Sequence, residues 1–139
     1  LGVPQEAPAR DAALRVLIVD DNAIVARSVA RMLSHHDVTI ETQAGRALEL
    51  LSDGDPYDAV LCDLMMPEMD GMELQRQLQA RNPRAVSRLI FVTGGAFTPR
   101  AHEFVRTTRH PVLDKPLDPD ALEAALQRVQ GAPEEPRGR

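Results

Sequence analysis

Short apolar runs alternate along the chain with segments in which apolar residues recur every three or four positions. The runs are rich in Val, Ile and Leu and predict five strands: 14–19, 38–41, 59–62, 89–92 and 112–114. The helical spacing predicts a helix after each strand: 23–34, 45–52, 71–81, 99–107 and a last one from 119 onward. This order predicts an α/β fold in which helices cover both faces of a parallel sheet.

The sequence signals for the predicted helices differ in strength. They are strongest for the last helix, because Asp118 is a good N-cap and Pro119 suits a first helical turn. Its inner face consists of four apolar residues: Leu122, Ala125, Leu126 and Val129. The signals are weakest for the helix over 99–107, which has three apolar residues: Ala101, Phe104 and Val105. In the helix over 23–34 five residues are expected to face the core: Ile24, Val25, Val29, Met32 and Leu33.

Acidic residues end two of the predicted strands, and a hydroxyl and an amine follow two others. The first strand ends in Asp20 and Asp21, the third in Asp63, and Thr93 and Lys115 follow the fourth and fifth. Ligands of parallel sheets bind in the crevice at the carboxyl ends of the strands. Three carboxylates gathered there repel one another, and a hard divalent cation such as Mg²⁺ would relieve that repulsion. The pattern predicts a cation site beside a phosphoryl-accepting carboxylate.

Composition and charge exclude several classes of protein. The chain has 139 residues, of which 43% are hydrophobic and 27% charged, as expected for one globular domain. A net charge of −5 and the lack of a basic cluster argue against nucleic-acid binding. No apolar run is long enough to span a bilayer and no secretory leader is visible, so we expect no direct membrane contact. The lone Cys62 is expected to be a small buried hydrophobe, and a reducing cytoplasm suits it.

Both ends of the chain differ in composition from its middle. Residues 1–11 contain two prolines and no apolar periodicity, and residues 131–139 are rich in Pro, Gly and charge. We therefore expect a linker or disordered leader at 1–11, one domain over 12–130 and a disordered tail at 131–139.

Four motifs together carry a family resemblance. The stretches VLIVDDN, VLCDLMMPEMDG, FVTGG and VLDKPL, in this order and spacing, resemble the receiver domain of two-component response regulators over about residues 14–130. The resemblance implies a flavodoxin-like, doubly wound (βα)₅ fold with strand order 2-1-3-4-5. The switch point of that order lies between strands one and three, where Asp20, Asp21 and Asp63 are expected to meet.

The resemblance also implies a role for each site residue. Asp63 is the expected nucleophile, whose carboxylate becomes an aspartyl phosphate. Mg²⁺ is expected on Asp21, Asp63 and the backbone carbonyl of Met65, with Asp20 acting largely through a bound water.

Two further residues are expected to serve the phosphoryl group. Lys115 would pair with one phosphoryl oxygen, aimed inward by a cis peptide bond to Pro116. Thr93 would donate a hydrogen bond to another oxygen.

The family's partners follow from this chemistry. The phosphodonor is expected to be a histidine kinase or a histidine phosphotransfer protein, possibly within the same chain, and the oligomeric state is not indicated. Two departures from the family pattern stand out: Val112 replaces an aromatic residue three positions before Lys115, and no output domain follows residue 130. We expect the terminal receiver of a hybrid histidine kinase rather than a stand-alone receiver, with a readout through Thr93 and the helix over 99–107.

Other interpretations exist for the whole chain. A haloacid-dehalogenase-type phosphatase needs Asp-x-Asp after its first strand, and a flavodoxin needs a phosphate loop there; Asp20-Asp21-Asn22 fits neither. A degenerate receiver, acting as an interaction scaffold without phosphorylation, is the more serious alternative.

Single residues also have ordinary structural interpretations. An aspartate after a strand commonly caps the next helix, and Asp70 before Gly71 is best interpreted that way. The methionines at 65, 66, 69 and 72 are expected to pack in the core rather than bind a soft metal. His35 and His36 have no carboxylate partner at ligand spacing and are expected at the surface.

Overall fold

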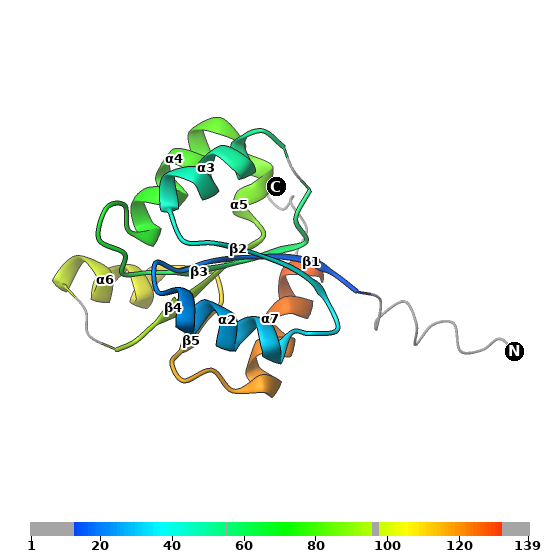
Figure 1. Ribbon diagram of the computed structural model, residues 1–139. Coiled ribbons are helices and arrows are strands. Elements are labelled where there is room, and N and C mark those ends of the chain that lie inside the picture. The colour runs from blue at the N-terminus through cyan, green and yellow to red at the C-terminus, as the bar shows by residue number, and fades with distance from the viewer. Residues whose placement is uncertain (1–12, 55, 96–97, 132–139) are drawn as a thin grey trace, which may run out of the picture.

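Five parallel strands form one sheet in the order β2-β1-β3-β4-β5, as predicted (Figure 1). The computed structural model describes residues 13–54, 56–95 and 98–131. The strands are β1 (Arg15–Val19), β2 (Asp37–Glu41), β3 (Ala59–Asp63), β4 (Leu89–Thr93) and β5 (Val112–Asp114). Since β1 pairs with both β2 and β3, the chain reverses its direction of travel across the sheet at the β1–β3 boundary.

Helices cover both faces of this sheet. They are α2 (Ala23–Met32), α3 (Ala44–Ser52), α4 (Gly71–Arg81), α5 (Pro83–Val86), α6 (Pro99–Thr107) and α7 (Pro119–Gly131). In Figure 1, α3, α4 and α5 lie above the sheet, α2 and α7 lie below it, and α6 stands at one end. The helix α5 was not predicted, because a single turn is too short to show a helical period.

Two apolar cores lie on either side of the sheet. Alternate residues of β1 serve different cores: Leu17 and Val19 pack with α3, α4 and α6, whereas Val16 and Ile18 pack with α2 and α7. All five residues of β3 and all five of β4 are buried. These central strands therefore have little freedom to move, and the residues at their carboxyl ends start from fixed positions.

Side-chain caps explain where several helices begin. Asn22 accepts hydrogen bonds from the backbone N–H groups of Ile24 and Val25, at 3.0 and 3.2 Å, so α2 starts at residue 23 as predicted. The predicted cap Asp118 accepts from the N–H of Ala121 at 2.9 Å. Such caps satisfy N–H groups that have no partner inside the helix.

Two expectations for α2 are wrong. The helix ends at Met32 rather than Ser34, and Ile24 is 73% exposed instead of facing the core. The stripe that packs on the sheet runs through Ala26 and Leu33, both fully buried. Ile24 lies two positions before Ala26, about 200° around the helix, so the two cannot share a face.

The predicted tails lie outside the described residues, except that α7 continues through Gly131.

Candidate functional site

The strand order brings the three predicted carboxylates together. Val19, the last residue of β1, is paired with Cys62 of β3, so Asp20 and Asp63 follow on neighbouring strands at the same edge. Carboxylate oxygens of Asp20, Asp21 and Asp63 lie within 4.8 Å of one another. Asp20 and Asp63 are buried, and Asp21 is exposed. The predicted acidic cluster is therefore present and is open to solvent on the side of Asp21.

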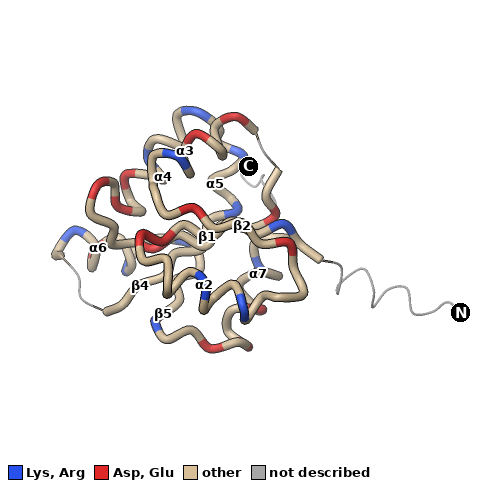
Figure 2. The backbone as a smooth tube through the Cα atoms, viewed as in Figure 1, with Lys and Arg blue, Asp and Glu red and all other residues tan. Residues whose placement is uncertain are grey.

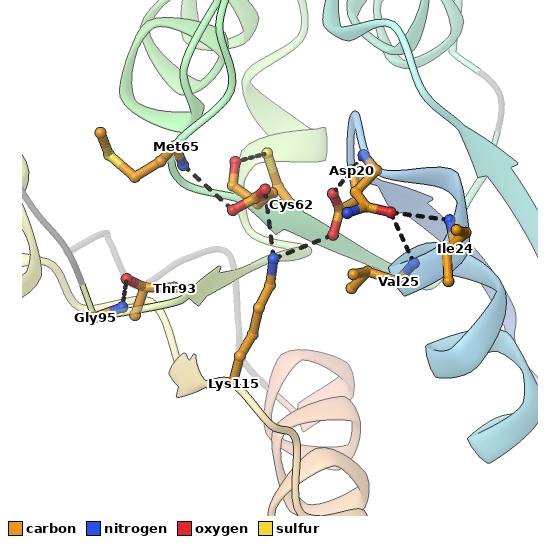
Figure 3. A network of polar contacts seen from close by, with 10 residues as sticks. Asp20, Ile24, Val25, Cys62, Met65, Thr93, Gly95 and Lys115 are labelled. Carbon is orange, nitrogen blue, oxygen red and sulfur yellow. Dashed lines mark hydrogen bonds and ion pairs between the residues drawn. The ribbon is translucent and has the colours of Figure 1, made fainter.

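Lys115 follows the edge strand β5, and its side chain extends toward this cluster (Figure 3). Its Nζ lies 3.4 Å from Oδ2 of Asp20 and 3.6 Å from Oδ2 of Asp63. The backbone continues the pairing of β4 and β5, since the N–H of Lys115 donates to the carbonyl of Thr93 at 2.8 Å. The peptide bond between Lys115 and Pro116 is cis, as the sequence led us to expect. Lys115 thus neutralises part of the negative charge of the cluster.

The surroundings of Asp63 make its carboxyl group harder to ionise than that of an ordinary aspartate. The pKa of Asp63 is raised to about 6, first by burial and then by the carboxylates of Asp20 and Asp21. Lys115 and a hydrogen bond from the N–H of Met65 oppose that rise in the pKa. A cation that binds beside a buried carboxylate stabilises its ionised form.

The donor set fits a hard divalent cation. Its three side chains offer carboxylate oxygens alone, and the exposed side of the cluster leaves room for the water ligands that Mg²⁺ retains. For Met65 the structure records an N–H that donates to Oδ1 of Asp63 at 3.3 Å. The metal role of the Met65 carbonyl stays a prediction.

Thr93 is fully buried at the end of β4, and its hydroxyl is engaged locally. Its Oγ1 accepts a hydrogen bond from the N–H of Gly95 at 3.2 Å. Among the described residues, no hydrogen bond joins the hydroxyl of Thr93 to the side chain of Asp63 or Lys115 (Figure 3). A Cβ built on Gly94 or Gly95 would meet no atom within 4 Å, so this flank of the site is open.

The ordinary interpretations of three sequence features are confirmed. Asp70 caps α4 by accepting from the N–H of Glu73 at 2.8 Å. Cys62 is completely buried, and burial raises the pKa of its thiol far above the usual range. The four methionines of this stretch belong to or pack against the core beneath α3 and α4.

The expectation for the two histidines is wrong in part. The side chain of His36 is 4% exposed, and its Nδ1 accepts a hydrogen bond from the N–H of Leu14 at 3.0 Å. Glu123 of α7 approaches Nε2 of both His35 and His36, at 3.2 and 3.4 Å. Since Nδ1 of His36 is an acceptor, the proton of its neutral ring sits on Nε2, which therefore has no lone pair for a metal. The group ties α7 to the turn before β2.

An apolar cleft opens beside the acidic cluster. It has a volume of about 540 Å³, and Asp20, Asp63 and Lys115 are among the residues that line it. The rest of its lining is mostly apolar and comes from α2, from the strands β1, β3 and β4, and from the segment after β5, including Ile24 and Leu117. The sequence did not reveal this cleft, because its walls lie more than 80 residues apart in the chain.

Comparisons with known proteins agree with this geometry. The sequence model of the response regulator receiver domain matches residues 16–127. The aerobic respiration control sensor protein ArcB of Escherichia coli is 36% identical over 120 residues, which are 84% of this chain and 15% of ArcB. The response regulator MprA of Mycolicibacterium vanbaalenii is 45% identical over 69 residues, 48% of this chain and 29% of MprA. The chain thus spans a small part of these relatives.

Solved structures show the same fold. The receiver domain of the sensor histidine kinase PA1611 of Pseudomonas aeruginosa, with magnesium in its active-site cleft, has a TM-score of 0.73 and 26% identity. The match covers 87% of this chain and all of that one. FixJ-N has a TM-score of 0.71 and 28% identity, with 84% and 93% covered.

No helix within the described residues combines the length and apolar composition needed to cross a membrane. The match over residues 16–127, the strand order and the acidic cluster agree: the chain belongs to the response regulator receiver domain family of two-component systems.

Proposed function

We propose that Asp63 accepts a phosphoryl group from a phosphohistidine in a Mg²⁺-dependent reaction. The observation that carries the proposal is the position of Asp63, buried at the meeting point of two other carboxylates and the ammonium of Lys115. In this step a carboxylate oxygen forms a bond to phosphorus while the phosphorus–nitrogen bond of the donor breaks. The electron pair of that bond leaves with the imidazole nitrogen, which then takes a proton.

The cation would be held by Asp21, Asp63 and the carbonyl of Met65, with Asp20 acting through water. When bound, Mg²⁺ supplies positive charge to the transferring phosphoryl oxygens. The all-carboxylate donor set and the raised pKa of Asp63 support this assignment. The magnesium in the PA1611 receiver lies in the cleft of the same fold.

Lys115 and Thr93 would serve the phosphoryl group after transfer. The ammonium of Lys115 already lies 3.6 Å from Asp63, close enough to pair with an oxygen placed on that carboxylate. The hydroxyl of Thr93 must first turn from Gly95 toward the phosphoryl group. A conformational signal would begin at this rearrangement.

The phosphodonor would be a histidine kinase or a histidine phosphotransfer protein in the cytoplasm. The similarity to the sensor protein ArcB and to the receiver of the sensor histidine kinase PA1611 supports an origin in a hybrid histidine kinase. The domain itself would occupy residues 12–130.

Labelling with acetyl phosphate and Mg²⁺, followed by intact-mass spectrometry, tests the proposal. The protein should gain one phosphoryl group that hydroxylamine removes, and chelation of Mg²⁺ should prevent the gain. Asp63→Asn should abolish labelling, whereas Asp120→Asn, at an exposed position in the first turn of α7, should label normally. Failure of the folded wild-type protein to label would favour a scaffold without phosphorylation. Labelling that persists in Asp63→Asn would move the acceptor elsewhere.

A further inference from the structure

The carboxylate of Asp70 joins two segments that border the phosphoacceptor. Its Oδ1 accepts the hydrogen bond that caps α4, from the N–H of Glu73 at 2.8 Å. Its Oδ2 pairs with Nη1 of Arg100, in the first turn of α6, at 3.3 Å. One side chain therefore connects the segment after β3 with the segment after β4.

Asp70 stands on backbone that is fixed against Asp63. The next residue, Gly71, is so tightly packed that a Cβ there would lie 3.2 Å from the carbonyl oxygen of Asp63. The same Cβ would lie 3.2 Å from the ring of Phe91 and from Cα of Leu64. The N–H of Gly71 also donates to the carbonyl of Leu64 at 2.9 Å. The backbone next to the partner of Arg100 is thus packed tightly against the backbone of the phosphoacceptor.

Arg100 belongs to the least firmly packed helix of the described chain. Ala101 is the buried residue of α6, and the side chain of Arg100 is 62% exposed. The segment that leads into α6 starts at Thr93, whose hydroxyl holds the N–H of Gly95. If Thr93 turns toward a phosphoryl group on Asp63, that hydrogen bond breaks and the segment before α6 must adjust.

We propose that Arg100, acting through Asp70, is a positioning residue that holds the first turn of α6 in its resting arrangement. The inference rests on the proposed phosphorylation of Asp63. The ion pair is formed in the resting structure and opposes displacement of α6 relative to the α4 cap. Its removal should therefore favour the phosphorylated arrangement, by the two- to fivefold that about one exposed ion pair supports.

Substitutions of Arg100 and Asp70 distinguish a restraint on α6 from a long-range effect of charge on anion binding. Arg100→Gln removes a positive charge near an anionic ligand, and Asp70→Asn removes a negative charge while keeping an oxygen that can cap α4. Long-range charge effects would shift the affinity for an anion in opposite directions in these two variants. Loss of a shared restraint would shift it in the same direction in both.

The test is titration of each variant with beryllofluoride in the presence of Mg²⁺, followed by nuclear magnetic resonance. We expect two- to fivefold tighter binding in Arg100→Gln and in Asp70→Asn, and no further gain in the double variant. Arg100→Lys should return the affinity to the wild-type value. Arg106→Gln, on the same helix but paired with Glu103, is the matched control and should bind as wild type does.

Unchanged affinity in Arg100→Gln, shifts of opposite sign in the two single variants, or additive effects in the double variant would each overturn the proposal. Should Asp70→Asn lose the α4 cap and unfold, the comparison of Arg100→Gln with Arg100→Lys still decides the question. Failure of the proposed function looks different, because the wild-type protein would then bind no beryllofluoride and gain no phosphoryl group.

Discussion

Helices α6 and α7 follow the last two strands of the sheet, but they are attached to the sheet in different ways. Each begins with a proline after a side-chain cap, Thr98 for α6 and Asp118 for α7. The inner face of α7 is buried, through Leu122, Ala125, Leu126 and Val129. In α6 one small residue is buried, and Phe104 and Val105 are half-buried.

Polar contacts widen the difference between the two helices. The far end of α7 is tied to the opposite edge of the sheet, by Arg88 to the carbonyl of Val129 at 3.1 Å and by Gln130 to the carbonyl of Asp58 at 2.6 Å. The ring of Phe104 meets Phe91 edge-on at 5.1 Å, and Arg100 pairs with Asp70 across an exposed surface. Figure 2 shows basic and acidic residues along α6, which lies at the edge of the molecule.

The difference in packing between α6 and α7 suits the different roles proposed for Thr93 and Lys115. The chain between β5 and α7 carries Lys115, which must hold its position beside Asp63. Thr93 ends β4 and leads toward α6, and its hydroxyl changes partner in the proposed function. A firmly packed helix beside Lys115 and a loosely packed one beside Thr93 suit these tasks.

Core truncation should show the largest difference between the helices. Leu126→Ala should lower the free energy of unfolding by about 3 kcal/mol, because it leaves a cavity in a fully buried position. Phe104→Ala should cost about 1–2 kcal/mol, because the ring is half-buried and its site can collapse. Urea denaturation measures both values. Equal costs would mean that α6 is as well anchored as α7.

Removal of the negative charge of Asp63 should raise the free energy of unfolding without changing how firmly α6 and α7 are packed. Asp63→Asn should raise the free energy of unfolding by about 1–2 kcal/mol at pH 7, because it removes a carboxylate whose pKa burial raises to about 6. Because α6 is less buried than α7, we expect faster hydrogen exchange in α6, and this difference should persist in Asp63→Asn. If Asp63→Asn instead tightens α6, then charge repulsion rather than sparse packing loosens that helix.

The same pKa predicts how stability depends on pH. Above pH 6 the folded protein carries this carboxylate charged at a cost that the unfolded chain does not bear. As the pH falls from about 6 toward about 4, the folded protein takes up the proton first, and the contribution of Asp63 to stability rises. Urea denaturation at several pH values should show this rise in the wild-type protein and not in Asp63→Asn.

Mg²⁺ should act on global stability and leave the local opening of α6 unchanged, because its proposed ligands follow β1 and β3. At ten times its dissociation constant it should add about 1.4 kcal/mol. Asp21→Ala should lose most of this gain, and Asp20→Ala less of it, since only Asp21 is a proposed direct ligand beside Asp63. Thermal melts with and without Mg²⁺ measure the gain. An equal gain in Asp21→Ala and wild type would contradict the assigned metal site.

The smallest effect is expected at Gly95, two residues after the end of β4. Gly95 has a φ of +94°, a backbone conformation that other residues rarely adopt. Gly95→Ala should therefore cost about 1 kcal/mol through its backbone conformation alone, because the space around its Cβ is free. Gly94→Ala is the matched control, with equal space and no positive φ, and should be nearly neutral. Similar costs in both variants would show that backbone conformation is not the cause.

Much of this arrangement could be predicted from the sequence, because local patterns determine it. The positions of Asp20, Asp63 and Lys115 at strand ends follow from apolar runs whose order defines the sheet. The cap at Asp70 follows from the residue type before a helical period.

The features that escaped prediction join elements far apart in the chain. The approach of Glu123 to His36 and the pairing of Arg100 with Asp70 depend on how helices are placed around the sheet. The exposure of Ile24 depends on a rotation of α2 about its axis, which a mixed apolar pattern does not define. No short-range pattern records such packing.

Hydrogen exchange with and without beryllofluoride and Mg²⁺ tests the central claim most directly, namely that α6 responds to the phosphoryl group and α7 does not. The account predicts a change in exchange over 94–107, an unchanged α7, and loss of the change in Thr93→Ala, which should still label on Asp63. A response centred on Val112 and α7 that survives in Thr93→Ala would contradict it.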